Sequence, residues 1–259
     1  MCSSHIVRTA LAGATPPPAV AELAPTVTFA GFRHVADLTH ALTPDFPVFP
    51  FYQPWEMKRL AAVENEGFAA FELRVAEHTG THVDAPCHFY ADGICVDALA
   101  AGRLVAPLVV VSIAERAARD DDALLLPDDI VAWERAHGRI PAGAVVAMHS
   151  GWESRVGDAA RFLNADAAGV MHHPGVGPEA AALLVHERGV AAVGVDTISL
   201  DLGASTTYDA HLAVLGAGLY GLENLANLTR VPPAGATLVV GAPKHQGGTG
   251  GPARVLALF

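Results

Sequence analysis

The sequence has few cysteines, few basic residues and no long apolar run, and each shortage argues against a class of protein. Three scattered cysteines, an odd number, do not make a disulfide framework and indicate a reducing compartment. A net charge of −11 disfavours nucleic acid and anionic membranes as partners. No run reaches the ~18 apolar residues of a membrane helix, and the N-terminus lacks the pattern of a secretory signal. We therefore expect a cytoplasmic protein.

The chain of 259 residues is 51% hydrophobic and 17% charged, which is typical of a globular protein. Residues 1–31 are rich in alanine and proline and are predicted to form a partly ordered N-terminal arm, and residues 32–259 are predicted to form one domain. Apolar strands are predicted at 32–39, 68–77, 104–113, 144–149, 190–196, 236–241 and 254–259. Proline begins and glycine follows the helices predicted at 127–138 and 178–188, and 150–177 is predicted as a loop. The alternation indicates an α/β fold with a mixed sheet.

The densest set of polar groups is H-T-G-T-H-V-D-A-P-C-H at residues 78–88. The β-branched residues, Gly80 and Pro86 disfavour a helix, so we predict an extended strand. Alternation in a strand would place the polar groups on one face, with Gly80 leaving room for an ion between two histidines. The buried face would carry Thr79, Thr81 and Val83, and the polar face would carry His78, His82, Asp84 and His88.

Imidazole and carboxylate together suit Zn, Mn or Fe(II) better than metals that prefer thiolate or all-oxygen sites. Four such groups on one face favour a metal site over a strand of solvated or core histidines. Cys87 lies inside the motif; we interpret it as a small buried filler, the alternative being a redox-sensitive neighbour of the site.

This motif resembles the H-x-G-T-H-x-D-x-P-x-H signature of the metal-dependent cyclase family, which includes kynurenine formamidases (arylformamidases), isatin hydrolases and some dienelactone hydrolases. The resemblance implies a swivelling β/β/α fold for residues 32–259 and assembly as a homodimer or homotetramer. It also implies a divalent cofactor, Mn²⁺ or Zn²⁺, bound as one ion or two. Kynurenine formamidases carry a further ligating His and Glu in the pattern seen here at His211 and Glu223.

The resemblance divides the polar groups by role. His88, which follows Pro86, is implied to be the catalytic proton donor and acceptor. Asp196 and Asp201 are predicted either to orient a ligating histidine or to cap loops. The paired histidines His172 and His173 are given a structural role, the alternative being that they bind metal or face the pocket. The implied metal ligands are His78, His82, Asp84, His211 and Glu223.

Residues 43–55 hold four prolines and five aromatic residues, so they can form neither a helix nor a central strand. Such a segment suits one wall of an apolar pocket, the alternative being a surface loop packed on the core. Its candidate substrate-binding residues are Phe49, Phe51, Tyr52 and Trp55. Kynurenine formamidases have a Trp-Pro step that contacts the substrate, and Phe49-Pro50 departs from it.

The C-terminal stretch 243–258 resembles the end of isatin hydrolases, and its glycines are expected to form a flexible turn with close backbone approach to neighbouring elements. We therefore predict a metal-dependent hydrolase that uses activated water on the C–N bond of a small cyclic or aromatic amide, such as an isatin-like lactam. Alternatives are a kynurenine formamidase, a lactone (dienelactone) hydrolase, or an inactive metal-binding member of the family.

Overall fold

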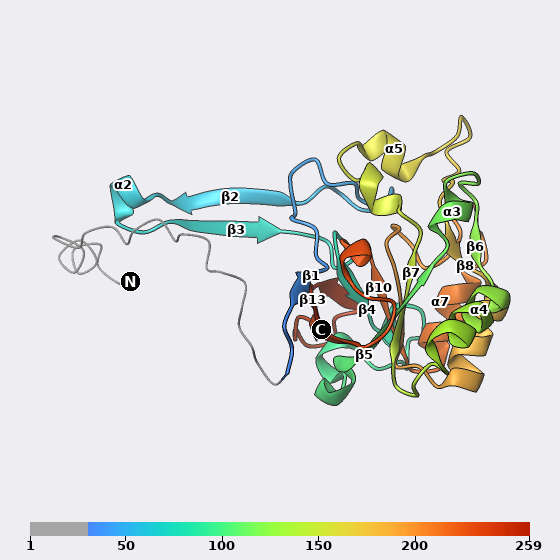
Figure 1. Ribbon diagram of the computed structural model, residues 1–259. Coiled ribbons are helices and arrows are strands. Elements are labelled where there is room, and N and C mark those ends of the chain that lie inside the picture. Colours follow the sequence, from blue (N-terminus) through green and yellow to red (C-terminus); the bar gives the residue numbers. More distant parts are fainter. Residues whose placement is uncertain (1–30) are drawn as a thin grey trace.

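A nine-stranded mixed sheet forms the centre of the computed structural model, which describes residues 31–259 (Figure 1). Its middle is four parallel strands in the order β5 (Val105–Ser112), β7 (Val145–His149), β9 (Ala192–Val195) and β10 (Tyr220–Glu223). Antiparallel strands extend it on both sides. Beside β5 lie β11 (Ala236–Gly241), β13 (Arg254–Leu258) and β1 (Val35–Asp37); beside β10 lie β4 (His82–Asp84) and β12 (Gly250–Pro252). The predicted α/β fold with a mixed sheet is confirmed.

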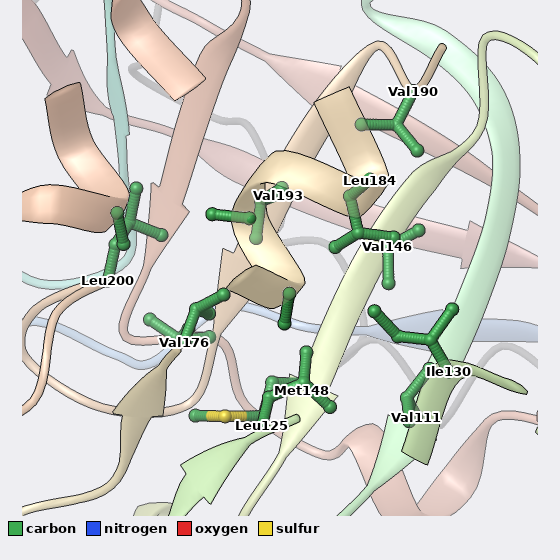
Figure 2. Close-up of a cluster of buried hydrophobic side chains, with 14 of the residues drawn as sticks. Val111, Leu125, Ile130, Val146, Met148, Val176, Leu184, Val190, Val193 and Leu200 are labelled. Carbon is green, nitrogen blue, oxygen red and sulfur yellow. The ribbon is translucent and has the colours of Figure 1, made fainter. Parts of the chain in front are cut away.

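Both faces of the sheet are covered by apolar side chains, because alternate residues of each strand point to opposite sides. Along β7, Val146 and Met148 belong to one buried cluster, and Val145 and Ala147 belong to the other. The first cluster, drawn in Figure 2, packs the sheet against helices α4 (Pro127–His137), α6 (Pro178–Ala182) with its π-helical continuation η5 (Leu183–Arg188), and α7 (Asp209–Gly216). The parallel strands are therefore buried on both faces, which explains their continuous apolar runs.

Most predicted elements are present. The predicted helices correspond to α4, which ends at Gly138, and to α6 with η5, which end at Gly189. The predicted strands correspond to β1, β3 (Ala70–Arg74), β5, β7, β9, β11 and β13. The prediction of a loop at 150–177 is wrong, because that segment contains η4 (Trp152–Arg155), α5 (Ala159–Leu163) and β8 (Gly175–Val176). Asp158 starts α5, since its carboxylate accepts a hydrogen bond from the Arg161 amide.

The remaining elements are short. The predicted N-terminal arm, residues 1–31, lies outside the described residues except for Gly31. Among the described residues, no helix is long and apolar enough to cross a membrane. The short elements are β2 (Glu56–Ala61), α2 (Val63–Glu66), η1 (Pro86–His88), η2 (Val96–Ala98), η3 (Ala101–Arg103), α3 (Ala114–Ala117), β6 (Leu124–Leu125) and η6 (Leu228–Arg230).

Strand β2 pairs with β3 to form a hairpin that stands away from the body of the molecule (Figure 1). Figure 1 shows α2 at its tip. Unlike the other predicted strands, β3 therefore lies outside the main sheet.

The packing of the first cluster makes a testable prediction. Leu184 is fully buried between η5 and the sheet (Figure 2), so Leu184→Ala should lower the free energy of unfolding by about 2–5 kcal/mol through lost burial and a residual cavity. Leu126→Ala is a matched control, since Leu126 is 39% exposed. Urea denaturation measures both, and equal losses for the two variants would contradict this assignment of the core.

Candidate metal centre

The prediction of one extended strand from His78 to His88 is wrong. Only His82–Asp84 form a strand, and Pro86–His88 form a 3₁₀ turn. Gly80 has a φ of 66°, in the left-handed region that glycine favours. A Cβ atom there would lie 2.4 Å from Leu42, so the glycine makes room for Leu42 and not for an ion. The chain turns at Gly80, and this turn places His78 beside the end of β4.

The bend brings together the first three predicted ligands. His78 Nδ1 lies 2.6 Å from Asp84 Oδ1, and His82 Nε2 lies 3.2 Å from the same oxygen. The three donor atoms of this group all lie within 4.8 Å of one another. The predicted burial of Thr79, Thr81 and Val83 is confirmed.

Sheet register brings in the fourth predicted ligand, and a helix brings in the fifth. Antiparallel pairing of β10 with β4 sets Glu223 opposite His82, and Glu223 Oε2 lies 3.3 Å from His82 Nε2. From α7, His211 Nε2 lies 3.4 Å from Asp84 Oδ2 and 3.1 Å from Glu223 Oε1. Asp84, His211 and Glu223 thus form a second group of three donors that shares Asp84 with the first.

The five side chains fit a divalent metal ion. Within the described chain, His82 Nε2 and Asp84 Oδ2 are buried without a hydrogen-bond partner. Buried polar atoms are nearly always satisfied, so these two call for a further group between them. Three imidazoles and two carboxylates are the donors that Zn²⁺ and Mn²⁺ accept, and no thiol lies in either group.

Asp201 and Asp196 differ in their contacts. His211 Nδ1 donates a hydrogen bond to Asp201, which also accepts a hydrogen bond from the Ala210 amide at the start of α7. Asp201 therefore orients a predicted ligand and caps its helix, combining both alternatives from the sequence. Asp196 accepts from the amides of Ser150 and Gly151 and from the Ser150 hydroxyl, so it braces the loop after β7.

The C-terminal glycine-rich segment is part of the site. The expected turn lies at residues 245–248 and the expected close backbone approach is confirmed, but Gly250–Pro252 form a strand. Its strand β12 pairs with β4, and a Cβ on Gly250 would lie 2.2 Å from the Val83 carbonyl oxygen. Thr249 Oγ1 lies 2.9 Å from His78 Nε2 and donates to Glu77, which also contacts His245. This series of contacts, from Glu77 through Thr249, orients the ring of His78. Thr249 and Glu77 are 172 residues apart, so no sequence spacing indicated the contact.

Burial and the contacts among the side chains of the site shift their pKa values strongly. Burial opposes charge on His82, but Asp84 and Glu223 outweigh it and raise the pKa of His82 to about 10. Burial acts against ionisation of Asp84 as well, yet the adjacent histidines hold the pKa of its carboxyl well below the usual range. His88 differs, because burial, aided by His78 and His211, lowers its pKa to about 4. His88 is therefore uncharged at neutral pH.

A cavity of about 180 Å³ opens beside the donors. The His88 ring stacks on that of His78 with centroids 3.8 Å apart, on the wall of the cavity. Three of the four predicted aromatic residues also line it. Trp55 does not line it; the Trp55 indole is buried and donates to the Thr43 carbonyl. The full lining is Phe49, Phe51, Tyr52, His78, His88, Phe89, Ile198, Ser199, Tyr208, His211 and Glu223.

Four of these lining residues are not indicated by the sequence: Phe89, Ile198, Ser199 and Tyr208. Phe89 stacks on His211 with ring centroids 4.8 Å apart, and Tyr208 contacts both rings. The position of Phe89, directly after His88, was the one available signal for it. Tyr208 adopts a left-handed φ of 55° immediately before α7. No sequence pattern indicated this conformation.

The paired histidines His172 and His173 lie in different surroundings. His172 contacts Asp122 on the surface, whereas His173 is fully buried near Trp152. His173 lines a neighbouring cavity of about 200 Å³ that shares Phe49 with the first. Within the described chain, neither histidine belongs to the donor groups.

Comparison with known proteins identifies the family, since a model described as putative cyclase matches residues 36–202. The chain belongs to the cyclase family. This cyclase-family protein is 36% identical to isatin hydrolase of Roseibium aggregatum over 246 residues, 88% of this chain and 92% of that protein. Kynurenine formamidase of Salinibacter ruber is 29% identical over 85% of this chain and 95% of its own. A crystal structure of an isatin hydrolase bound to the product analogue thioisatinate superposes with a TM-score of 0.83, at 36% identity over 87% of this chain and 92% of the other.

The geometry makes a prediction about metal content. His82 Nε2 lies within 3.3 Å of both Asp84 and Glu223, so His82→Ala should lose most bound Mn²⁺ or Zn²⁺ after reconstitution of the chelated protein. Elemental analysis after desalting measures the ion-to-chain ratio. His186→Ala is a matched control on the exposed surface. Equal metal in wild type and His82→Ala would refute the assignment.

Proposed function

We propose that this protein is a metal-dependent hydrolase that cleaves the C–N bond of an isatin-like lactam. One observation carries the proposal: five buried metal donors lie beside a small aromatic cavity in a chain 36% identical to an isatin hydrolase along most of its length. The ion is Mn²⁺ or Zn²⁺, bound alone or as a pair that shares Asp84. The proposed location is the cytoplasm.

The residues divide the work between holding the ion and moving protons. His78, His82 and Asp84 would hold one ion beside the cavity, and Asp84 with His211 and Glu223 would hold a second. A bound divalent ion would lower the pKa of water towards ~7 and polarise a carbonyl. An imidazole nitrogen of His88, uncharged at neutral pH, accepts the proton of the attacking water and delivers it to the departing nitrogen of the lactam.

The cavity walls suit a flat aromatic substrate. Phe89 and Tyr52 contact the rings of His211 and His78 respectively, so aromatic faces flank the donors on two sides. Phe49 lines the same cavity, while Phe51 is 82% exposed and lies at its rim. An aryl formamide or a lactone presents the same carbonyl to activated water, so both remain alternatives to the lactam, as does an inactive metal-binding protein.

Removal of His88 should separate proton transfer from metal binding. His88→Ala should retain its metal and lose about 10²–10⁴-fold in kcat on isatin, since the other two imidazoles on the cavity wall, His78 and His211, belong to the metal donor groups. Turnover of isatin, N-formylkynurenine and a dienelactone is compared in the same assay, with His186→Ala as the matched control. Loss of metal in His88→Ala would make His88 a ligand, and no hydrolysis of any substrate by metal-loaded wild type would support the inactive alternative.

We further propose that two or four copies assemble through the β2–β3 hairpin. Cross-strand pairing places Met57 opposite Leu73 and Arg59 opposite Phe71 on one face. Met57, Phe71 and Leu73 are 52%, 42% and 59% exposed, and a two-stranded hairpin alone is marginally stable. A second copy of the chain would cover this apolar face.

Light scattering after size exclusion tests the assembly. The double variant Phe71→Ser, Leu73→Ser should shift the protein to monomers, because it removes two apolar side chains from the exposed face. The double variant Lys58→Ser, Glu72→Ser alters the opposite face of the same hairpin and should keep the assembly. A monomeric wild type would sink the proposal.

A further inference from the structure

Two free cysteines lie at the ends of one small closed loop beside His88. Cys87 belongs to η1 and Cys95 immediately precedes η2. The Cys87 amide donates to the Ile94 carbonyl at 3.2 Å, which brings the start of the loop against its end. Gly93 permits this closure, because a Cβ there would lie 2.7 Å from the Cys87 nitrogen.

A shared acceptor fixes the two cysteines in place. The Cys87 thiol donates to the Gly248 carbonyl oxygen at 3.4 Å, and the Val96 amide, directly after Cys95, donates to the same oxygen at 2.9 Å. The side chain of Cys87 and the backbone next to Cys95 therefore meet at one atom. A disulfide needs Cβ atoms about 3.5–4.5 Å apart. The Cys95 thiol is a hydrogen-bonding neighbour of the Cys87 thiol, so the two sulfur atoms already lie side by side.

The two thiols differ in reactivity. Burial, together with the neighbouring Cys95 thiol, raises the pKa of Cys87 to about 12. Cys87 therefore keeps its proton at neutral pH until it reacts. Both cysteines are partly exposed, so a peroxide can reach the Cys95 thiol directly.

We propose that Cys87 and Cys95 are a modification site, forming a reversible disulfide on exposure to hydrogen peroxide. The Cys95 sulfur attacks one peroxide oxygen, the O–O bond breaks, and a sulfenic acid and one water form. The Cys87 sulfur then attacks the Cys95 sulfur, the S–O bond breaks, the S–S bond forms and a second water leaves. Two thiols lose two electrons in total, and the peroxide is reduced to two waters.

The modification acts on the neighbouring histidine. To form the bond, Cys87 Sγ leaves the Gly248 oxygen and moves towards Cys95, which pulls on η1. His88 is the next residue, its amide bonds the Ala85 carbonyl, and its ring stacks on His78. A displacement of about 1 Å in such a group can cost 10²-fold in rate. Oxidation is therefore expected to lower turnover roughly tenfold to hundredfold, a consequence that rests on the proposed function of His88.

Mass spectrometry tests the modification without a substrate. No Lys or Arg lies between Arg74 and Arg103, so one tryptic peptide, residues 75–103, contains both cysteines. After peroxide treatment this peptide should lose two hydrogen atoms and resist alkylation, and dithiothreitol should reverse both changes. The Cys2→Ser variant should behave in the same way, which separates this pair from the remaining cysteine. Free thiols in the treated peptide, or added oxygen at Cys95 without the hydrogen loss, would overturn the proposal.

Two readouts then test the effect on His88. Isatin turnover should fall on oxidation and recover with dithiothreitol in wild type, and should be unchanged in Cys95→Ala under the same treatment. The rate at which diethyl pyrocarbonate modifies His88 should also change on oxidation, and this rate needs no substrate. A disulfide that alters neither readout would refute the coupling. Absent turnover in untreated wild type would count against the proposed function, while the mass and modification rates still decide this proposal.

Discussion

The buried carboxylate of Asp84 is the group on which the site depends. Asp84 is 1% exposed and within 3.4 Å of three imidazoles, one from the bend before β4, one from β4 itself and one from α7. A buried charge is tolerated only when it is paired, so these contacts must all form together. Strands β10 and β12 hold β4 from both sides, and Gly221, opposite Asp84, leaves space for its side chain.

The motif predicted the donors well and their geometry poorly. His78, His82 and Asp84 lie within seven residues, so they are near one another in any compact conformation, and a strand was not required to gather them. The alternation argument failed at Gly80, whose positive φ turns the chain and resets the side-chain direction. Local composition therefore identifies a ligand set more securely than it identifies the backbone that presents it.

The contacts that depend on how the strands pair could not be predicted from sequence patterns. The pairing of β12 with β4 brings Thr249 into contact with His78. The sequence of Gly250–Pro252, however, has no apolar alternation and indicates a turn. By contrast, β5 and β7 are buried on both faces, so each is a continuous apolar run that could be recognised. The short strand β10, with Gly221 and Glu223 in four residues, carries no such signal, although it supplies a predicted ligand. The resemblance to a family supplied what periodicity lacked.

Pro86 explains why adjacent members of one motif have different roles. Proline ends β4 after Asp84 and begins the 3₁₀ turn that carries His88 away from the carboxylates and onto the cavity wall. Had the strand continued, His88 would have followed the alternation of β4. On the wall, burial without a direct carboxylate contact leaves it uncharged, while His82 lies within 3.3 Å of both Asp84 and Glu223. One proline thus separates the proposed proton-transfer group from a proposed metal ligand six residues away.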